Sequence, residues 1–432
     1  MQPAKVAIVG LGTVGTGVAR LLVEQGPRLE RHAGRPIELA RAVVRDLQKP
    51  REITLPPGRV TDDISQVTDD AEIQAVVQLI GGLEPARSIM LRLLESGKDV
   101  ITANKALLAE HGDELFGRAR ELGRTIAFEA SVAGGIPIIA NISQCLSANQ
   151  IESIRGILNG TSNFLLTQME EQGVPYAAAL SEAQRLGYAE ADPTMDVDGT
   201  DAVQKLAILA HLAFGARVPW NQIPCRGIDV VQLEDVRYAQ ELGYRIRLLA
   251  VAQLMPEGLE LHVSPTLVKI GTPLAEVRGA FNAISVVGDA VGRVFYHGLG
   301  AGQMPTASAV VADLIDTVVG RAAITFRTLE FWSRREARVT PRDHAVASGR
   351  FYLRFSAQDR PGVLSDITQV LGKHGISIAS VIQHEADEDE SHVVPLVIMT
   401  HTTTEGASLE AMAEIDGLNC VRPPSVRMRV RD

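Results

Sequence analysis

Residues 5–15 have the sequence KVAIVGLGTVG, a short apolar run followed at once by a glycine-rich loop. The apolar residues that follow have helical spacing and stop at Gly26, so the order is strand, loop, helix. In such a unit Gly10 permits a tight turn, Gly12 a close approach of the backbone to a pyrophosphate, and Gly15 close helix packing. The stretch predicts a dinucleotide site, with a purely structural glycine turn as the alternative.

Strand-like and helical runs alternate after this loop, which predicts an α/β fold with a doubly wound parallel sheet. The expected strands cover residues 37–44, 75–80, 100–102 and 125–128, and the expected helices 84–96 and 106–122. Ligands bind such sheets beyond the carboxyl ends of the strands. Lys105, in the sequence TANK, is therefore a candidate site residue, although a lysine at a strand end is more often a solvated charge.

The second expected strand ends in Val44-Arg45-Asp46. An acidic residue at this place would bind the ribose 2′-hydroxyl of NAD, whereas a cation suits the 2′-phosphate of NADP. Arg45 therefore favours NADP. NAD stays open because Asp46 is adjacent, and Arg45 could also be only a solvated charge.

Residues 187–205, GYAEADPTMDVDGTDAVQK, combine five carboxylates with one ammonium group. Apolar spacing predicts a helix over residues 202–214, with Thr200 as its N-cap and Gly215 as its left-handed stop. Asp201 and Lys205 then share one helix face. The simplest interpretation is a surface ion pair, which contributes roughly 0.3–0.5 kcal/mol.

A lysine beside a carbonyl can donate the proton that its reduction requires and stabilise the developing negative charge. Burial and a neighbouring Lys105 would depress the pKa of Lys205, whereas Asp201 would keep it charged. Glu190 and Asp201 would attract an α-ammonium group, which favours an amino-acid substrate. The other three carboxylates could bind substrate, accept backbone N–H groups or be solvated. Residues 159–163, Asn-Gly-Thr-Ser-Asn, are rich in turn formers and could be only a turn at the exit of a strand, so they are not selected as catalytic.

With these motifs and residues 129–137 in this order, the chain resembles homoserine dehydrogenases from its N-terminus to about residue 335. The resemblance implies NAD(P)-dependent interconversion of L-homoserine and L-aspartate 4-semialdehyde, a step towards threonine, methionine and isoleucine. Another amino-acid dehydrogenase is a competing reading. A second alternative is a regulatory protein that senses a dinucleotide and an amino acid and keeps the fold without catalytic activity. The presence of Lys205 and Asp201 counts against this alternative.

The resemblance also implies roles for individual residues. Lys205 matches the family's proton donor and acceptor, Lys105 lies between nicotinamide and substrate, and Glu190 and Asp201 hold the substrate, with Asp196 as a further candidate. Cofactor contacts are expected from Gly10, Gly12, Thr13, Val14, Gly15, Arg45, Lys105, Gly187 and Gly302. The family's monovalent cation site, for sodium, matches Glu129, Val132, Gly134 and Ile136, although the same loop would also serve as a turn without an ion.

The C-terminal third predicts a further module. Residues 305–335 are expected to form a helix that returns to the nucleotide domain, and 336–349 a polar linker. The order of residues 350–432, βαββαβ ending in a short strand, resembles the ACT domain, which implies threonine as effector; a purely dimerising module is the alternative. Residues 1–137 would then be the nucleotide domain and 138–304 an α+β substrate and dimerisation domain, in a homodimer or homotetramer.

Composition agrees with a globular enzyme. The chain has 432 residues, 46% hydrophobic and 22% charged, with a formal net charge of −10 and a pI near 5.6. Such an acidic chain is not expected to bind nucleic acid. No apolar run approaches the roughly 20 residues that span a bilayer, and the first expected strand leaves no room for a signal peptide. Three scattered cysteines lack metal-ligand spacing, so we expect a cytoplasmic protein.

Overall fold

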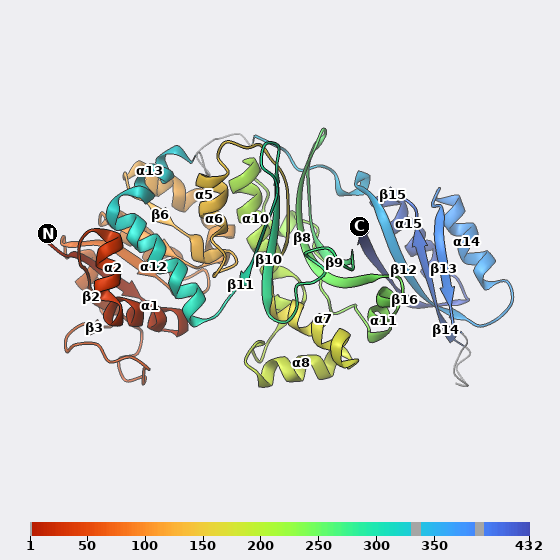
Figure 1. The fold of residues 1–432 in the computed structure, drawn as a ribbon, viewed down its shortest axis with the longest axis horizontal. Helices are drawn as coiled ribbons and strands as arrows, with labels where there is room; N and C mark the ends of the chain where they lie inside the picture. Colours follow the sequence, from red (N-terminus) through yellow and green to blue (C-terminus); the bar gives the residue numbers. More distant parts are fainter. Residues whose placement is uncertain (1, 330–337, 385–392) are drawn as a thin grey trace. The chain divides into compact units, whose positions relative to one another are not determined.

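The structure is a computed structural model that describes residues 2–329, 338–384 and 393–432. The chain forms two compact units (Figure 1). The first consists of Met1–Glu152, Gln204–Gln222 and Val286–Thr340, and the second of Ser153–Val203, Ile223–Ser285 and Pro341–Asp432. The chain passes from one unit to the other within strand β7 (Ile151–Ile157), helix α10 (Thr200–Phe214) and strand β10 (Phe281–Gly288).

The first unit contains a six-stranded parallel sheet in the order β3-β2-β1-β4-β5-β6, which confirms the predicted doubly wound sheet. Its strands are β1 (Ala4–Val9), β2 (Ile37–Val43), β3 (Val60–Thr61), β4 (Ile73–Gln78), β5 (Asp99–Thr102) and β6 (Ile126–Ala127). The strand order reverses between β1 and β4, the point at which such sheets bind a dinucleotide. Strand β11 (Gly292–Leu299) also belongs to this unit.

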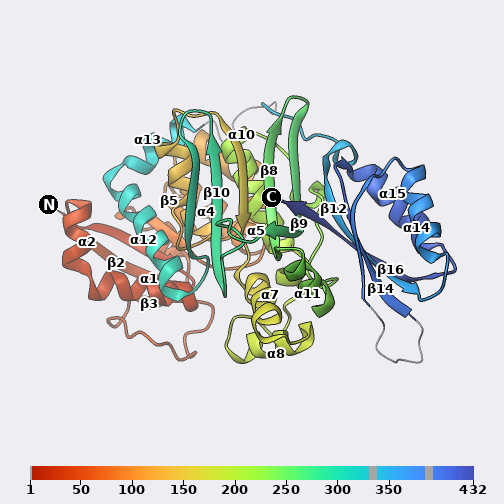
Figure 2. The ribbon, with the colours of Figure 1, turned by 45° about the vertical axis from the view of Figure 1, so that its right-hand side comes forward.

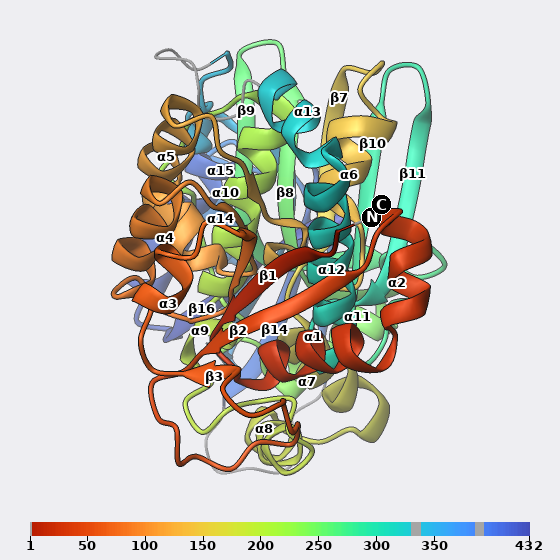
Figure 3. The same cartoon turned by 90° about the vertical axis from the view of Figure 1, so that its left-hand side faces the viewer.

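Helices cover both faces of the parallel sheet. Figure 3 shows α1 (Thr13–Glu24), α2 (Gly26–Ala33) and α12 (Gln303–Val319) on one face, with α4 (Ala86–Glu95) and α5 (Lys105–Glu121) on the other. Val6 and Ile8 of β1 pack with Val18 of α1 and Val310 of α12 in one buried cluster. The shorter helices of this unit are α3 (Ser65–Thr68), α6 (Ile138–Ala140), α13 (Arg321–Thr328) and the turns η1 (Glu129–Ser131), η2 (Asn141–Cys145) and η3 (Trp220–Gln222).

The helix expected over residues 305–335 is two helices where it is described. Gly320 has a φ of 87°, a left-handed conformation that ends α12, and α13 starts at the next residue. Residues 330–335 lie outside the described residues.

The second unit is built on a sheet in the order β7-β8-β9-β16-β12-β14-β13, with β10 beside β7. Strands β8 (Tyr244–Met255) and β9 (Gly258–Lys269) form a long antiparallel hairpin. The helices of this unit that precede the C-terminal module are α7 (Gly160–Gln172), α8 (Tyr176–Arg185), α9 (Thr194–Val197), the start of α10, and α11 (Leu233–Glu241).

The C-terminal module has the predicted βαββαβ order. It consists of β12 (Ser348–Gln358), α14 (Val363–Lys373), β13 (Ile378–Gln383), β14 (Val393–Thr400), α15 (Glu405–Asp416) and β16 (Val421–Arg431), with the two-residue strand β15 (Thr403–Thr404) before α15. Figure 2 shows α14 and α15 on one face of its sheet, where Phe351 and Phe355 pack with Ile367 and Ile415. The last strand has 11 residues, longer than expected; it pairs with β12 from Val421 to Val430, and its end also pairs with β9 from Arg429 to Arg431.

The expected linker is only partly described, because residues 336 and 337 lie outside the described residues. From Arg338 the chain is bonded to other segments, since the Arg338 N–H donates to the Gly215 carbonyl at 3.2 Å and the Arg342 N–H to that of Leu259 at 2.9 Å. A 3-10 turn, η4 (His344–Val346), precedes β12.

Candidate active site

The glycine loop between β1 and α1 has the geometry that a pyrophosphate needs. Gly10 has a φ of 103°, and a Cβ there would lie 3.0 Å from the Leu79 carbonyl oxygen at the end of β4. A Cβ on Gly15 would lie 1.9 Å from the Gly10 carbonyl oxygen, so a larger residue cannot occupy that position without a shift of the backbone. A Cβ on Gly12 would meet nothing within 4 Å. The loop is thus tightly packed against the protein at Gly10 and Gly15, whereas Gly12 has free space beside it.

Helix α1 begins in this loop with no side-chain cap and no acidic residue in its first turn. The first N–H groups of a helix lack partners within the helix and attract anions. Helix α12 begins close by, because a Cβ on Gly17 of α1 would lie 3.0 Å from the Gln303 carbonyl oxygen. Gly302, with a φ of 119°, is the N-cap of α12. The structure therefore gathers the glycine loop, Thr13, Val14 and Gly302 in one region of the first unit.

Lys105 is the first residue of α5, directly beyond the carboxyl end of β5. Asn104 fixes this helix start, because its side-chain oxygen accepts the Leu107 N–H at 3.1 Å. The Asn104 amide also donates to the carbonyls of Ile80 at 3.1 Å and Gly82 at 2.7 Å, which follow β4. Lys105 thus lies at the carboxyl edge of the sheet, where the sequence placed it.

Arg45 is exposed and follows the end of β2 by two residues. The neighbouring Asp46 carboxylate accepts the Gln48 N–H at 2.9 Å, so it shapes its own loop. Both side chains are exposed, and one oxygen of the Asp46 carboxylate is engaged in its own loop.

Substitution of Gly15 and substitution of Gly12 are expected to have different effects. Gly15→Ala is expected to lower both cofactor affinity and the free energy of unfolding, the latter by about 1–3 kcal/mol, because the new methyl group overlaps the Gly10 carbonyl. Gly12→Ala should leave stability nearly unchanged and weaken only cofactor binding. Calorimetric titration with NADP and urea unfolding of both variants would test this. Wild-type affinity in Gly12→Ala would show that the cofactor does not approach this loop.

The acidic segment is organised by its own carboxylates. The Gly199 carbonyl accepts the Val203 N–H at 2.9 Å, so Gly199, with a φ of 90°, is the N-cap of α10 and the prediction for Thr200 is wrong. Thr200 is the first helical residue, and its N–H donates to the Asp198 carboxylate at 2.7 Å. Gly215, with a φ of 67°, ends the helix as predicted. Asp192 similarly accepts the Thr194 N–H at 3.1 Å and its hydroxyl at 2.6 Å.

Asn159 joins two of the predicted substrate residues, Asp196 and Asp201. Its amide nitrogen donates to Asp196 Oδ1 at 2.8 Å and to Asp201 Oδ2 at 2.9 Å, and its amide oxygen accepts the Ser162 N–H at 2.7 Å. Asn159 is 4% exposed and is the N-cap of α7. Sequence reasoning treated it as part of a turn and did not select it. The signal available was its place between a buried strand, β7, and the start of a helix, α7.

Residues 161 and 162, which follow Asn159, make two further hydrogen bonds to the acidic segment. The Thr161 hydroxyl donates to the Tyr188 carbonyl at 2.8 Å, and the Ser162 hydroxyl to that of Asp196 at 2.6 Å. The Asn163 amide donates to the Gly279 carbonyl at 2.9 Å. The residues from Asn159 to Asn163 therefore hold the loop that carries the predicted substrate groups.

Asp201 and Lys205 are not a surface ion pair, since they are only 5% and 8% exposed. They lie one turn apart on α10, and the boundary of the units passes between them. Lys105 and Lys205 belong to the first unit, whereas Gly187, Glu190, Asp196 and Asp201 belong to the second. Glu190 and Gly187 are exposed.

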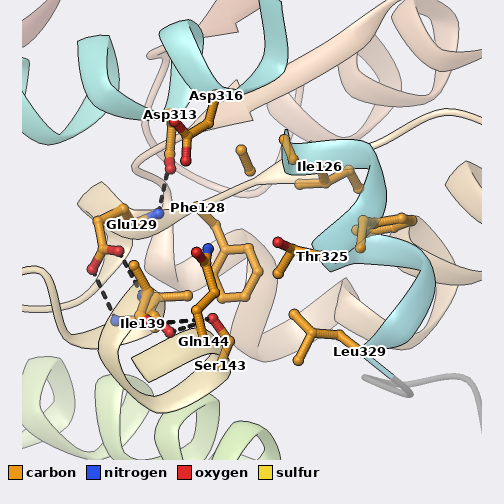
Figure 4. Close-up of a pocket in the computed structure, with 14 residues that line it drawn as sticks. Ile126, Phe128, Glu129, Ile139, Ser143, Gln144, Asp313, Asp316, Thr325 and Leu329 are labelled. Atoms are coloured by element: carbon orange, nitrogen blue, oxygen red, sulfur yellow. Dashed lines mark hydrogen bonds between the residues drawn. The ribbon is translucent and has the colours of Figure 1, made fainter. Parts of the chain in front are cut away.

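The loop expected to hold a cation lies in the first unit. Figure 4 shows the side chain of Glu129, its first residue. The Glu129 carboxylate, 6% exposed, accepts the N–H groups of Ile139 and Ala140, both at 2.8 Å, and burial raises its pKa to about 7. Its side chain thus caps the start of α6. Ala133 has a φ of 51° and is the only non-glycine residue with a positive φ in the described part of the chain. The strained turn thus offers main-chain carbonyl groups beside the carboxylate as candidate oxygen ligands.

Comparisons with known proteins agree with this geometry. A family model described as homoserine dehydrogenase, NAD binding domain matches residues 10–129, one described as homoserine dehydrogenase matches 137–315, and the ACT domain matches 351–418. A homoserine dehydrogenase of Pseudomonas aeruginosa is 44% identical, covering 100% of this chain and 99% of that protein. This chain belongs to the homoserine dehydrogenase family. It is thus an oxidoreductase that acts on a CH–OH group and uses a nicotinamide cofactor.

Solved structures of homoserine dehydrogenases extend the comparison. One from Thiobacillus denitrificans has a TM-score of 0.92 and 44% identity, covering 100% of this chain and 99% of that one. A hyperthermophilic archaeal homoserine dehydrogenase in complex with NADPH has a TM-score of 0.62 and 26% identity, covering 74% of this chain and 98% of that one. In the part of the chain described, no helix combines the length and apolar character that crossing a membrane requires.

Proposed function

We propose that the chain interconverts L-homoserine and L-aspartate 4-semialdehyde with NADP, as a step in the synthesis of threonine, methionine and isoleucine. The observation that carries this proposal is the Asn159 amide bonded to both Asp196 and Asp201. Two carboxylates held on one amide make a site for a cation, and an amino-acid substrate brings one in its α-ammonium group. Glu190 and Gly187 lie on the same segment and complete the proposed substrate and cofactor contacts.

The chemistry requires a proton at the substrate oxygen and a hydride at its carbon. The glycine loop, Gly302 and Arg45 would hold NADPH, which would supply the hydride when bound. Lys205 donates the proton to the oxygen as the aldehyde is reduced and takes it back in the oxidation. Its ammonium group also stabilises the negative charge on that oxygen, and Lys105 orients the substrate beside the nicotinamide.

Arg45 supports NADP because it is an exposed cation just after the end of β2, and one oxygen of the neighbouring Asp46 carboxylate is bonded within its own loop. Arg45→Ala is expected to raise the KM for NADP by about tenfold or more, since a charged hydrogen bond contributes about 1.5–3 kcal/mol. The KM for NAD should change little. Initial rates with both cofactors give the ratio, and an equal change for both would remove Arg45 from phosphate recognition.

A sodium ion is proposed at the turn of residues 129–136. The proposed ligands come from Glu129, Val132, Gly134 and Ile136, with main-chain carbonyls and the Glu129 carboxylate as the oxygen donors that suit such an ion. The ion would fix the strained turn and take no part in proton or hydride transfer.

The C-terminal module is proposed to bind threonine as a feedback inhibitor, on the basis of its ACT fold. The protein is proposed to be a homodimer or homotetramer, since β13 ends the sheet order of the second unit and Val381 on it is 41% exposed. The three cysteines are free, which fits a reducing cytoplasm.

The deciding experiment is steady-state oxidation of L-homoserine with NAD and NADP, with sodium present and with or without L-threonine. We expect turnover, a preference for NADP and suppression by threonine. Turnover without suppression would limit the C-terminal module to assembly. No turnover in folded protein would overturn the proposed substrate.

A further inference from the structure

A second cavity lies in the second unit, away from the Asn159 cluster. It has a volume of about 400 Å³. Its lining comes from five segments: residues 224–226, residues 262–265 of β9, His344 of η4, Glu405 and Leu409 of α15, and residues 427–429 of β16. It therefore lies where the last strand and second helix of the C-terminal module meet β9. None of its lining residues belongs to the proposed catalytic or cofactor groups.

Positive charge exceeds negative charge in the lining. Three arginines, Arg226, Arg427 and Arg429, face one carboxylate, Glu405. The Glu405 carboxylate lies 2.5 Å from Arg427 Nη2 and 2.7 Å from Arg429 Nη2. Burial alone would raise its pKa, but His344 and these two arginines outweigh burial and lower the pKa to about 2. Glu405 is therefore a permanent anion that balances only one of the three cations.

Charged residues that lie next to the lining but are not part of it do not remove this excess of positive charge. Glu260 is 2.8 Å from Arg429 Nη1 and 3.7 Å from Arg431 Nη2. Since Glu260 and Arg431 carry opposite charges, together they add nothing to the sum. Arg226 also interacts with the carboxylates of Asp229 and Asp235, of which Asp235 is paired with Arg354. The arginines still outnumber the carboxylates of the lining, and a cavity of this kind favours an anion.

His262 supplies a second, independent observation. It is 2% exposed, and neither ring nitrogen has a hydrogen-bond partner among the described residues. Glu260 Oε1 is 3.5 Å from His262 Nδ1 but outside hydrogen-bond geometry. The Ser264 hydroxyl, on the same strand, also lacks a partner in the described structure. Buried polar groups in folded proteins are nearly always satisfied, so these atoms point to a ligand.

We propose that this cavity binds a small oxyanion, a phosphate or carboxylate compound, with its charge on Arg226 and Arg427 and hydrogen bonds to His262 and Ser264. The neutral imidazole of His262 can donate one hydrogen bond and accept another, so a ligand that also carries a hydroxyl group fits best. The cavity is large enough for a small metabolite rather than for a single ion alone.

The wall of the cavity touches the turn that precedes Asp201. The Cys225 thiol donates to the Asp198 carbonyl at 3.4 Å, and the Ile228 N–H donates to the Val197 carbonyl at 2.8 Å. On the other side, Arg226 Nη1 donates to the Arg427 carbonyl at 3.2 Å. A ligand between Arg226 and Arg427 would therefore shift the KM for homoserine, a consequence that rests on the proposed function, whereas the binding itself does not.

The test is isothermal titration of the full-length protein with inorganic phosphate and, separately, with succinate. Saturable binding of either is expected, and the tighter of the two identifies the anion class. Leu409→Trp, which fills the cavity from α15, should weaken binding by about tenfold or more. Leu364→Trp is the matched control, because Leu364, on α14, is 43% exposed against 46% for Leu409 but does not line the cavity; this variant should bind as the wild type does.

Ser264→Ala keeps the test decisive if the tryptophan variant fails to fold. It removes one unpartnered hydroxyl and should weaken binding by roughly fivefold, the loss of one hydrogen bond. Absence of saturable heat with both anions would overturn the proposal, as would wild-type affinity in Leu409→Trp or in Ser264→Ala. Because titration needs no turnover, failure of the proposed activity would not affect this result.

Discussion

Lys205→Ala is expected to lower kcat for homoserine oxidation by about 10³-fold or more while the affinity for NADP stays unchanged. Lys205 is 8% exposed on α10, one turn after Asp201, so its side chain is largely buried. Losing it removes both the proton donor and the charge that stabilises the substrate oxygen. The glycine loop and α1, which bind the cofactor, are separate elements and should not be affected. Steady-state turnover assays measure kcat, and calorimetric titration with NADP measures the cofactor affinity separately.

Gln204→Ala is the matched control for this variant. Gln204 precedes Lys205 on the same helix and is also buried, at 5% exposure, so its substitution perturbs α10 without removing a charge. It should retain most of the activity. Loss of activity in both variants would attribute the effect to the helix, and full activity in Lys205→Ala would contradict the proposed role of the lysine.

The parallel sheet could be predicted from sequence because its signals are local. Gly10 and Gly15 are fixed by contacts within the strand, loop and helix unit, since Gly15 packs against the Gly10 carbonyl only five residues away. The βαββαβ order of the C-terminal module follows in the same way from the periodicity of each segment. In both cases the residues that determine the structure are close together in the sequence.

The site was harder to predict because its contacts join distant segments. Asn159 lies 42 residues from Asp201, and Asn-Gly is also typical of an ordinary turn, so the sequence did not distinguish the two roles. The N-cap of α10 was assigned to Thr200 because threonine is favoured there, but Asp198 supplies the capping carboxylate and Gly199 the left-handed turn. Tertiary contacts outweighed the local preference at each of these positions.

The last prediction concerns the contribution of a buried charge network in the second unit to the stability of the protein. Asp235 of α11 is fully buried and accepts hydrogen bonds from Arg354 Nε at 2.6 Å, Arg354 Nη2 at 3.1 Å and the Tyr352 hydroxyl at 2.9 Å. Arg354 and Tyr352 lie on β12 of the C-terminal module and are themselves buried. Asp235→Ala should lower the free energy of unfolding by about 3–5 kcal/mol, because it leaves the Arg354 guanidinium buried without its counter-ion. Urea unfolding followed by circular dichroism measures the change.

Two further variants separate the buried charge from simple loss of a side chain. Glu234→Ala removes the adjacent carboxylate, which is 55% exposed and 3.9 Å from Arg354, and should cost less than about 1 kcal/mol. Adding Arg354→Met to Asp235→Leu should recover much of the stability lost by Asp235→Ala, because an apolar pair can replace a buried ion pair at little cost. If Asp235→Ala destabilised the protein no more than Glu234→Ala, the buried pair would contribute nothing to attaching β12 to α11.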